Sequence, residues 1–435
     1  MIYLLFGLCF LVWLGMHFHV FRVIRDTRFL ASLSKSAIGS AILLLFLFPF
    51  VRNYFSSELP ISLMLWIHFI SVIWIVFVIQ CCLWSLVSYC VISLVSFAYK
   101  KFGVNSGFDF SSRQKAIISI TLSLILIIYG YLDAKNLRVR EYTISDRRIP
   151  ASVERFRIVH VTDIHCGGLV SNIDLLREIV DRIKTLSPDL VISSGDLVDK
   201  PMLNRPEMEN IYRSLQPPYG KIGVTGNHEF LSGIDEAVAF HKSAGFRLLR
   251  NEGILVTPFL AVFGVDDPFG KGKNLKRFNE SELLQAPLRE ASSTGDVPAL
   301  DGPMPALGKN PTNESVKQPT PDVIASAPSP SLDVAPRRGN NAFFGNAFRI
   351  FVKHPPSVTP EAQEAFDLQL SGHTHGGQFF PLHILMKLVH NVPMGFSKHG
   401  SRLSLYLSSG AGTYGPPVRI FAPPEITVID LVPLK

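Results

Sequence analysis

Nine side chains of types that can bind metal ions fall in five short clusters in the C-terminal two thirds of the chain. The clusters are Asp163-Ile164-His165, Gly195-Asp196, Gly226-Asn227-His228-Glu229, the single His354, and Gly372-His373-Thr374-His375-Gly376-Gly377. Carboxylate, imidazole and amide oxygen ligands without cysteine suit hard or borderline divalent ions such as Mn, Fe, Zn or Mg. A carboxylate that bridges two such ions holds them roughly 3.5–4 Å apart, a spacing used in phosphoryl chemistry.

Each cluster follows an apolar run that predicts a buried β-strand. The runs are Phe156–Val161, Asp189–Ile192, Lys221–Val224, Arg349–Val352 and Phe366–Leu370. Ligand-type side chains that recur where strands end are expected to meet at the carboxyl edge of an α/β sheet. A single residue of this kind is more often a helix cap or a surface group. Five such clusters in this order predict a metal centre.

The spacing within the first clusters suggests how the ligands are shared. Asp163 and His165 lie two residues apart on extended chain just past a strand, so a slight bend lets both reach one ion. Asp196, at the next strand end, is placed to bridge two cations. Its negative charge would be balanced by both ions.

The later clusters extend the same pattern. Asn227 supplies a neutral amide oxygen, and Gly226 is expected to allow the unusual backbone dihedral angles of a tight turn. His373 and His375 alternate along the chain, so their imidazoles can serve different ions. His354 follows its strand by two residues and could complete the shell of the second ion.

The region from residue 155 to 435 alternates strands with amphipathic helices, which predicts an α/β domain. Helices are expected over Asn172–Leu186 and Ile234–Ala244. Further strands are expected over Leu260–Val265, Leu403–Leu407 and Ile426–Leu431. Residues 291–340 contain nine prolines, four glycines and no aromatic residue, which predicts a disordered insertion within this domain.

The first 133 residues carry most of the hydrophobic excess of the chain. Four stretches lack Lys, Arg, Asp and Glu: Met1–Phe21, Ser36–Val51, Leu59–Tyr99 and Ala116–Leu132. Because a transmembrane helix needs ~20 apolar residues, we expect about four spans. Leu59–Tyr99 is favoured as one long helix over a hairpin around Gln80. Residues 134–154 are expected to be a juxtamembrane linker.

Basic residues in the loops after the first and third spans favour a cytoplasmic location for both loops. With four spans, the C-terminal domain would then lie outside the cytoplasm, whereas five spans would place it inside. The net charge of +7 is concentrated beside the spans, which favours contact with anionic lipid headgroups over nucleic acid. The lipid bilayer is therefore one expected partner.

The clusters resemble the signature of calcineurin-like metallophosphoesterases. The resemblance rests on Asp163-x-His165, Gly195-Asp196, Gly226-Asn227-His228-Glu229, His354 and Gly372-His373-x-His375, and covers roughly Phe156 to Leu431. Two stretches, Leu370–Gln378 and Gly410–Arg419, are similar to a membrane-associated bacterial branch. That branch joins several N-terminal spans to one phosphoesterase domain at the inner membrane, and some relatives act on UDP-2,3-diacylglucosamine in lipid A biosynthesis.

The resemblance implies a fold and a set of roles. The fold would be two packed mixed β-sheets flanked by helices, preceded by an all-α transmembrane bundle. Asp163, His165, Asp196 and His375 would hold the first of two divalent metal ions, and Asp196, Asn227, His354 and His373 the second. His228 would protonate the leaving oxygen or steady the phosphate. The sequence departs from the family pattern at the insertion, which comes shortly before the strand that leads to His354.

These expectations combine into a functional hypothesis. The chain is expected to be a membrane-anchored phosphoesterase, with manganese among its expected metals, that cleaves a phosphodiester, phosphomonoester or pyrophosphate bond with metal-activated water. Its membrane segments favour a phosphorylated, lipid-linked substrate. Two alternatives remain: a nuclease or nucleotide phosphodiesterase of the same fold, and a non-catalytic membrane scaffold with a degenerate domain.

Overall fold

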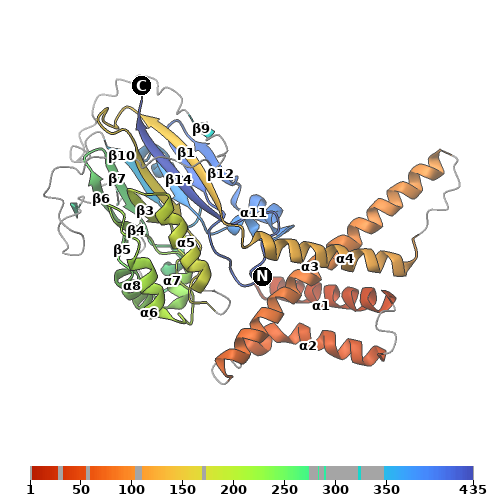
Figure 1. Ribbon diagram of the computed structural model, residues 1–435. Coiled ribbons are helices and arrows are strands. Elements are labelled where there is room, and N and C mark those ends of the chain that lie inside the picture. The colour runs from red at the N-terminus through yellow and green to blue at the C-terminus, as the bar shows by residue number, and fades with distance from the viewer. Residues whose placement is uncertain are drawn as a thin grey trace. The chain divides into compact units, whose positions relative to one another are not determined.

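The computed structural model (Figure 1) describes most of the chain, and those residues form two compact units. Described are residues 2–27, 33–54, 59–102, 110–168, 173–273, 283, 289–290, 322–324 and 347–434. The first unit comprises Met1–Asp133 together with Gly415–Ile420, and the second comprises Ala134–Tyr414 together with Phe421–Lys435.

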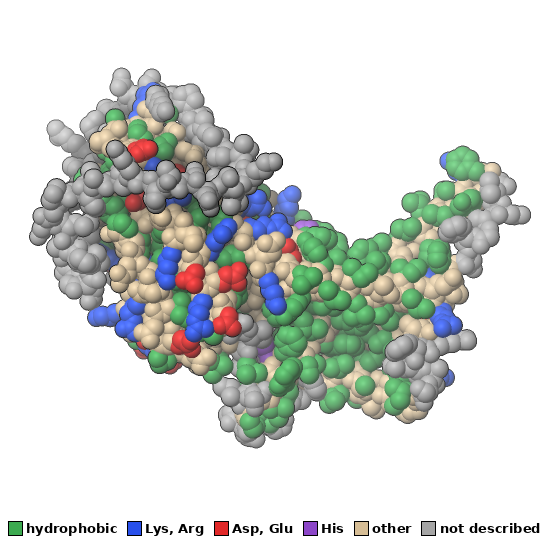
Figure 2. All heavy atoms as spheres, in the orientation of Figure 1, with side chains coloured by type: hydrophobic (Ala, Val, Ile, Leu, Met, Phe, Trp, Pro, Cys, Tyr) green, Lys and Arg blue, Asp and Glu red, His purple; other side chains and the backbone are tan. Residues whose placement is uncertain are grey.

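In the part of the first unit that the structure describes, four apolar helices are present: α1 (Ile2–Thr27), α2 (Lys35–Tyr54), α3 (Ile61–Lys101) and α4 (Ser112–Asp133). Within the described residues, three candidate membrane spans are long and apolar enough, at Gly7–Thr27, Leu63–Lys101 and Ser112–Asp133. A shorter apolar stretch covers Lys35–Leu47 of α2. Gln80 lies inside the single helix α3, so the hairpin alternative is not adopted. Figure 2 shows hydrophobic side chains covering much of the visible surface of these helices.

Polar contacts fix how these helices are arranged within the unit. Arg113, at the start of α4, donates from Nε to the carbonyl of Thr27 at the end of α1, 3.1 Å away. The end of α1 and the beginning of α4 therefore lie at the same end of the unit. The backbone N–H of Arg419 donates to the carbonyl of Gly130, which attaches the segment Gly415–Ile420 to α4.

Two mixed seven-stranded sheets form the centre of the second unit. The first sheet has the order β5-β4-β3-β2-β14-β1-β9, with β1 (Arg138–Asp146), β2 (Phe156–Val161), β3 (Leu190–Ser193), β4 (Lys221–Gly223), β5 (Phe246–Leu248), β9 (Asp322–Ile324) and β14 (Glu425–Pro433). Strands β2 to β5 run parallel, and β14 pairs antiparallel with β2 but parallel with β1.

The second sheet has the order β12-β13-β11-β10-β7-β6-β8. Its strands are β6 (Glu252–Thr257), β7 (Leu260–Gly264), β8 (Arg289–Glu290), β10 (Phe348–Val352), β11 (Leu368–Ser371), β12 (Gly395–His399) and β13 (Leu403–Leu407). Strands β7, β10, β11 and β13 are parallel, whereas β6 is antiparallel to β7 and β12 is antiparallel to β13. At the edge of the sheet, β8 pairs parallel with β6.

Some helices of this unit cover the outer faces of the sheets, and others pack on turns that follow the strands. The helices are α5 (Ile173–Thr185), α6 (Arg205–Arg213), α7 (Asn227–Ser232), α8 (Ile234–Ser243), α10 (Pro360–Ala365) and α11 (Leu382–His390), with short 3₁₀ turns η1 (Pro268–Lys273) and η3 (His375–Gly377). One core lies between the sheets, where Ile158 and Ile192 meet Ile350 and Leu370. A second packs β2 and β3 against α5 and α8, and a third packs β7 and β10 against α10. The expected fold of two mixed sheets flanked by helices is confirmed.

The expected linker over residues 134–154 is wrong for its first half. Residues Arg138–Asp146 form β1, which pairs along its whole length with β14. Val139 packs into the core beneath α5, whereas Tyr142 and Ile144 pack between the sheets. This alternation has period two, as expected for a strand, but the charged residues interspersed in it hide the pattern in the sequence.

The expected insertion at 291–340 falls mostly outside the described residues. Within it, Asp322–Ile324 forms β9 and pairs parallel with Tyr142–Ile144 of β1, at the edge of the first sheet. The reading of the rest of the segment as disordered stays a prediction.

Candidate metal centre

The ligand-type residues all follow the carboxyl ends of strands, as the sequence predicted. Asp163 and His165 come after β2, Asp196 after β3 and Asn227 after β4 in the first sheet. In the second sheet, His354 follows β10, while His373 and His375 follow β11. Strands β2, β3 and β4 are parallel to one another, as are β10 and β11, so each set of turns lies at one sheet edge. The candidate centre is built where these two edges meet.

Five of the seven expected ligands have left-handed backbone conformations. The φ angles are 54° at Asp163, 52° at His165, 51° at Asp196, 76° at His373 and 49° at His375. Asp163 and His165 were expected on nearly extended chain, and that local geometry is wrong. Non-glycine residues adopt this region rarely, and such residues concentrate at functional sites. The turns bend the chain sharply enough to direct neighbouring side chains inward.

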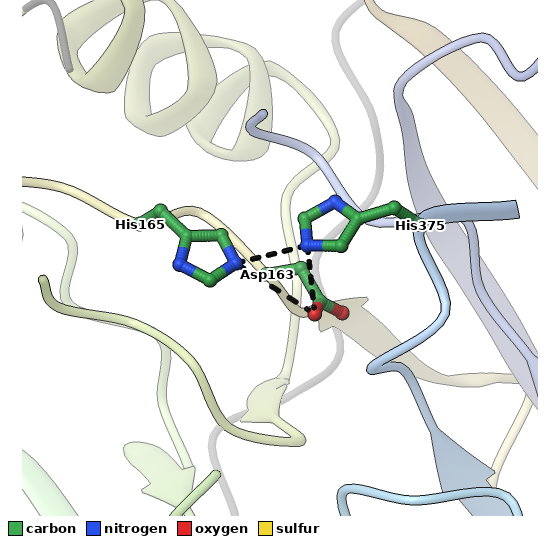
Figure 3. A group of neighbouring side chains, drawn as sticks. All are labelled: Asp163, His165 and His375. Carbon is green, nitrogen blue, oxygen red and sulfur yellow. Dashed lines mark hydrogen bonds and ion pairs between the residues drawn. The ribbon is translucent and has the colours of Figure 1, made fainter. Parts of the chain in front are cut away.

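The first group consists of Asp163, His165 and His375 (Figure 3). The Nε2 atoms of the two imidazoles lie 2.9 Å apart. Oδ1 of Asp163 is 3.4 Å from Nε2 of His375 and 3.9 Å from Nε2 of His165. All three side chains are largely buried. Two ring nitrogens and a carboxylate oxygen that converge on one point form a suitable donor set for a divalent cation.

The second group consists of Asp196, His354 and His373. Nε2 of His354 lies 3.1 Å from Oδ2 of Asp196 and is buried without an aligned hydrogen-bond partner. Nδ1 of His373 lies 3.0 Å from Oδ1 of Asn227. His354 therefore lies within the cluster, held by a hydrogen-bond contact of Nδ1 with the carbonyl of Ser194 at 2.8 Å.

Asp196 lies between the two groups. Its Oδ2 is 3.7 Å from Nε2 of His165 in addition to its short distance to His354. Its Oδ1 accepts a hydrogen bond from the backbone N–H of His228 at 2.8 Å. This central position agrees with a carboxylate shared by two ions. All seven expected ligands are brought into one site.

The electrostatics of the site favour positive charge. Burial opposes protonation of His354, but the carboxylates of Asp196, Asp163 and Asp267 raise its pKa to about 10. Burial would raise the pKa of Asp196, yet His354 and His165 hold it well below its usual value. The pKa of Asp163 is also lowered, because His375 and His354 outweigh its burial. Buried carboxylates that remain ionised create a demand for cations that bound metal ions would meet.

His228 has a partner that the sequence analysis did not identify. Its Nδ1 lies 2.6 Å from Oδ1 of Asp199, and the other oxygen of that carboxylate is 3.3 Å from Nδ1 of His165. Burial opposes ionisation of Asp199, but the hydrogen bonds and charges of His165 and His228 lower its pKa. The sequence did contain a signal for Asp199, because a second aspartate follows Asp196 by three residues in the same turn after the strand.

Glu229 also went unassigned, although its carboxylate joins two of the ligand-bearing turns. It accepts hydrogen bonds from the backbone N–H groups of Gly226 at 2.7 Å, Leu197 at 2.8 Å and Asp196 at 3.0 Å. The side chain is fully buried. The bonds connect the turn after β3 to the start of α7, which fixes the distance between Asp196 and Asn227.

Gly226 was expected to allow unusual backbone dihedral angles in a tight turn, and that explanation is wrong. Its backbone is extended, with φ −99° and ψ −174°, a conformation open to any residue. A Cβ atom at this position would instead collide with the Asp196 carboxylate. Glycine is required here for space rather than for backbone freedom.

Tyr414 borders the site from the loop after β13. Its ring centroid lies 4.8 Å from that of His228 and 5.5 Å from that of His165. Gln378 holds the loop by donating from Nε2 to the carbonyl of Tyr414 and accepting from its N–H, both at 2.9 Å. The residue remains 54% exposed. An exposed aromatic ring beside His228 is available to contact a substrate.

The nearby thiol is unsuited to nucleophilic catalysis. Cys166 is buried beneath the site, and burial raises the pKa of its thiol to about 12. A thiolate would therefore be scarce at neutral pH.

Sequence comparisons with known proteins agree with this geometry. Residues 156–377 match the calcineurin-like phosphoesterase family. An "Uncharacterized metallophosphoesterase" of Aquifex aeolicus is 28% identical over 314 residues, covering 71% of this chain and 97% of that protein. A "Transmembrane protein with metallophosphoesterase domain" of Danio rerio is 24% identical over 331 residues, covering 74% of this chain and 63% of that protein. Among solved structures, a sulfate thiohydrolase SoxB of Thermus thermophilus aligns with a TM-score of 0.31 and 10% identity, over 60% of this chain and 53% of that chain.

Because the family match covers just over half of the chain and contains every expected ligand, the chain belongs to the calcineurin-like phosphoesterases. It is a membrane protein and a metal-dependent phosphoric ester hydrolase, and its family uses two divalent metal ions. The non-catalytic scaffold alternative loses its main support, since no expected ligand is missing from the cluster.

Proposed function

We propose that this protein hydrolyses a phosphorylated, lipid-linked substrate at the membrane surface, of the type represented by UDP-2,3-diacylglucosamine. The observation that carries the proposal is the position of the metal centre relative to the chain's point of entry. Arg138, the first residue of β1, pairs with Glu425, and His160 near the end of β2 pairs with Thr427. Entry point and ligand turns are therefore at the same edge of the first sheet.

The length of the connection adds to this argument. Helix α4 ends at Asp133 and β1 begins at Arg138. Five residue steps span at most about 18 Å, even when fully extended. A candidate span thus leads almost directly into the sheet edge that carries the ligands. A substrate that itself resides in the bilayer would be supplied at this edge, which supports the lipid-linked class.

We assign the seven clustered residues to two ions, with Asp196 shared. Asp163, His165 and His375 would complete one shell, and Asn227, His354 and His373 the other. Two divalent cations held there would lower the pKa of a water molecule to near neutrality and would offset negative charge on phosphate oxygens. The metal identity is proposed as Mn, Fe, Zn or Mg.

His228 is the proposed proton donor to the leaving oxygen. The Asp199 carboxylate at 2.6 Å from Nδ1 fixes the orientation of its ring. With Nδ1 engaged, Nε2 is the nitrogen left to exchange a proton with a substrate. Tyr414 lies beside His228 and would contact the group attached to the phosphate.

The substrate class is tested with the purified full-length protein in detergent and Mn²⁺. Phosphodiester, phosphomonoester and lipid pyrophosphate substrates are compared by kcat/KM. A preference of at least about tenfold for the lipid pyrophosphate, a difference of about 1.4 kcal/mol in transition-state stabilisation, supports the proposal. Equal or higher activity on soluble nucleotide diesters would identify the nucleotide phosphodiesterase alternative instead.

We also propose that the helices cross the bacterial inner membrane four times, with the catalytic domain outside the cytoplasm. The contact between Arg113 and Thr27 supports an even number of crossings between the start of α1 and the end of α4. Arg22, Arg25 and Lys115 then share one membrane side, which the positive-inside tendency assigns to the cytoplasm.

A C-terminal green fluorescent protein fusion tests this orientation. With four crossings, the C-terminal reporter is exported by the Sec route and should not fluoresce. The same reporter fused after residue 102 stays in the cytoplasm and should fluoresce. Fluorescence of the C-terminal fusion would show that the domain is cytoplasmic.

A further inference from the structure

Helix α11 exposes an apolar face where a helix of a water-soluble domain would normally be polar. Ile384 is 50% exposed, Leu385 49%, Leu388 75% and Val389 63%. These positions follow the i, i+1, i+4, i+5 pattern of a single helical face. None of the residues of α11 is buried. Surface helices normally bury such a face, so its exposure calls for an occupant.

The opposite face of α11 carries its polar groups toward the metal centre. His383, Met386 and His390 line a cavity of about 230 Å³ together with Thr374 and Gly376 from the ligand turn. The ring of His390 lies 5.8 Å from that of the expected ligand His373. The helix is thus packed on the ligand turn by its His-bearing side, which leaves the apolar side directed away from the domain.

The charge around this face suggests which occupant it takes. Residues 378–400 contain no Asp or Glu but include Lys387 and Lys398, both exposed. Apolar side chains flanked by lysines and free of acidic groups are typical of helices that lie in the interface of an anionic bilayer. A protein partner would not specifically require this absence of acidic residues.

The chain itself provides the bilayer. The domain follows α4 after only four residues, at the sheet edge that carries the ligands. This edge is therefore tethered to the last candidate span by four residues, and burial of even a few side chains suffices for docking because the spans already supply the anchoring.

We propose that the outer face of α11, formed by Ile384, Leu385, Leu388 and Val389, docks into the surface of an anionic lipid bilayer. Docking places the ligand turn one helix width from the lipid headgroups. The inference deepens the proposed function, on which it rests for its biological purpose. It concerns lipid contact, however, and can be tested without any catalytic readout.

The test uses full-length protein in nanodiscs that contain phosphatidylglycerol. The photoreactive residue p-benzoylphenylalanine replaces Leu388, or Leu434 as a matched control. Leu434 is also exposed, at 43%, but follows the far end of β14. That end is about 26 Å along the sheet from the entry point. Lipid adducts at residue 388 should exceed those at residue 434 by at least about tenfold, because burying one leucine side chain in lipid favours the docked state by about that factor.

Two further arms make the assignment specific. Leu385→Glu should strongly reduce lipid adducts at residue 388, whereas Leu434→Glu should not, and both variants should keep the hydrolysis of bis(p-nitrophenyl) phosphate.

Nanodiscs made only of phosphatidylcholine should give fewer adducts. Adducts no more frequent than at residue 434, or adducts to α1–α4 or to a second copy of the chain, would overturn the proposal. Equal yields in neutral discs would overturn its anionic part.

This readout separates the inference from the proposed function. Lipid adducts at residue 388 without activity on lipid substrates would retain the docking surface and reject the substrate. Activity on lipid substrates without adducts at residue 388 would retain the lipid-linked substrate and reject the docking surface.

Discussion

At the scale of single residues, the carboxylate of Asp199 links two different tasks. One oxygen is 2.6 Å from His228 and the other 3.3 Å from His165, an expected metal ligand. Asp199 can therefore orient a proton donor and a ligand together, as carboxylates behind metal-bound histidines often do. We therefore propose that Asp199 is a positioning residue, which acts through His228 and His165.

Replacing His228 separates chemistry from metal binding. We expect His228→Ala to retain two metal ions and to lose roughly 10²–10⁴ in kcat, the usual contribution of a positioned acid. The loss should be largest for alkyl esters and smaller for nitrophenyl esters, whose leaving groups need little protonation. Metal analysis and a leaving-group series are the measurements, with His399→Ala as the control.

A different outcome would change the role of His228. Its ring also lies within 4.8 Å of ligand-type atoms of His165 and Asp196. Loss of metal from His228→Ala would identify it as a ligand. Equal losses for all leaving groups would indicate that it steadies phosphate oxygens.

Replacing Asp196 tests the shared carboxylate. Asp196→Asn should remove most activity and lower the metal content, because a neutral amide leaves two close cations poorly compensated. The control is Asp181→Asn on α5, where the carboxylate pairs with Lys184 at the surface. A variant with both metals and near-normal turnover would show that Asp196 is not the bridge.

At the scale of elements, the site depends on how the turns after β3 and β4 are tied together. Glu229→Gln should weaken this connection, because an amide accepts hydrogen bonds from backbone N–H groups less strongly than a carboxylate. Hydrogen bonds to charged groups contribute about 1.5–3 kcal/mol, so we expect a lower melting temperature and weaker metal affinity. Thermal unfolding and metal titration measure both.

The control for Glu229 is Glu236→Gln, which changes an exposed carboxylate in the first turn of α8. Unchanged metal affinity in Glu229→Gln would show that the turns hold their spacing without this carboxylate.

The strands that carry the site were largely predictable from sequence. The apolar runs before Asp163, Asp196, Asn227, His354 and His373 correspond to β2, β3, β4, β10 and β11 within about two residues, the usual uncertainty of an element boundary. Long buried runs give a strong signal because parallel strands are apolar on both faces. By contrast, β1 was missed, because its half-buried positions alternate with charged residues.

The left-handed turns could not be predicted from residue types. Aspartate and histidine tolerate positive φ better than most residues, yet their identities did not reveal it at Asp163 or His375. Asp199, Glu229 and Tyr414 were missed for a related reason. Their roles come from contacts between segments distant in sequence, and no local spacing records such contacts.

At the scale of the whole molecule, the segment 291–340 should be dispensable for the metal centre. Its described strand β9 lies at the edge of the first sheet, beyond β1, whereas the ligands follow β2, β3 and β4. Deleting the segment should therefore leave metal content and hydrolysis of a soluble diester largely unchanged, since loop-closure entropy varies slowly with loop length.

Metal analysis and diester kinetics of the deletion variant check this expectation. Removing Pro360–Ala365, the α10 helix packed against the second sheet, is the positive control for structural damage. Loss of metal in the 291–340 deletion would show that the segment supports the fold of the centre.

Because five expected ligands have left-handed backbone conformations, the stability of the folded protein depends on the supply of metal ions. Each such conformation costs about 1–2 kcal/mol relative to a relaxed residue, and ionised carboxylates crowded without cations add to that cost. Bound metal returns stability in proportion to its concentration over its dissociation constant. In metal-poor surroundings, selection for protein stability would therefore favour glycine at these positions, and the ligand side chains would be lost with the activity. In metal-rich surroundings, the same selection would preserve it, so the habitat's metal supply decides whether stability and catalysis compete.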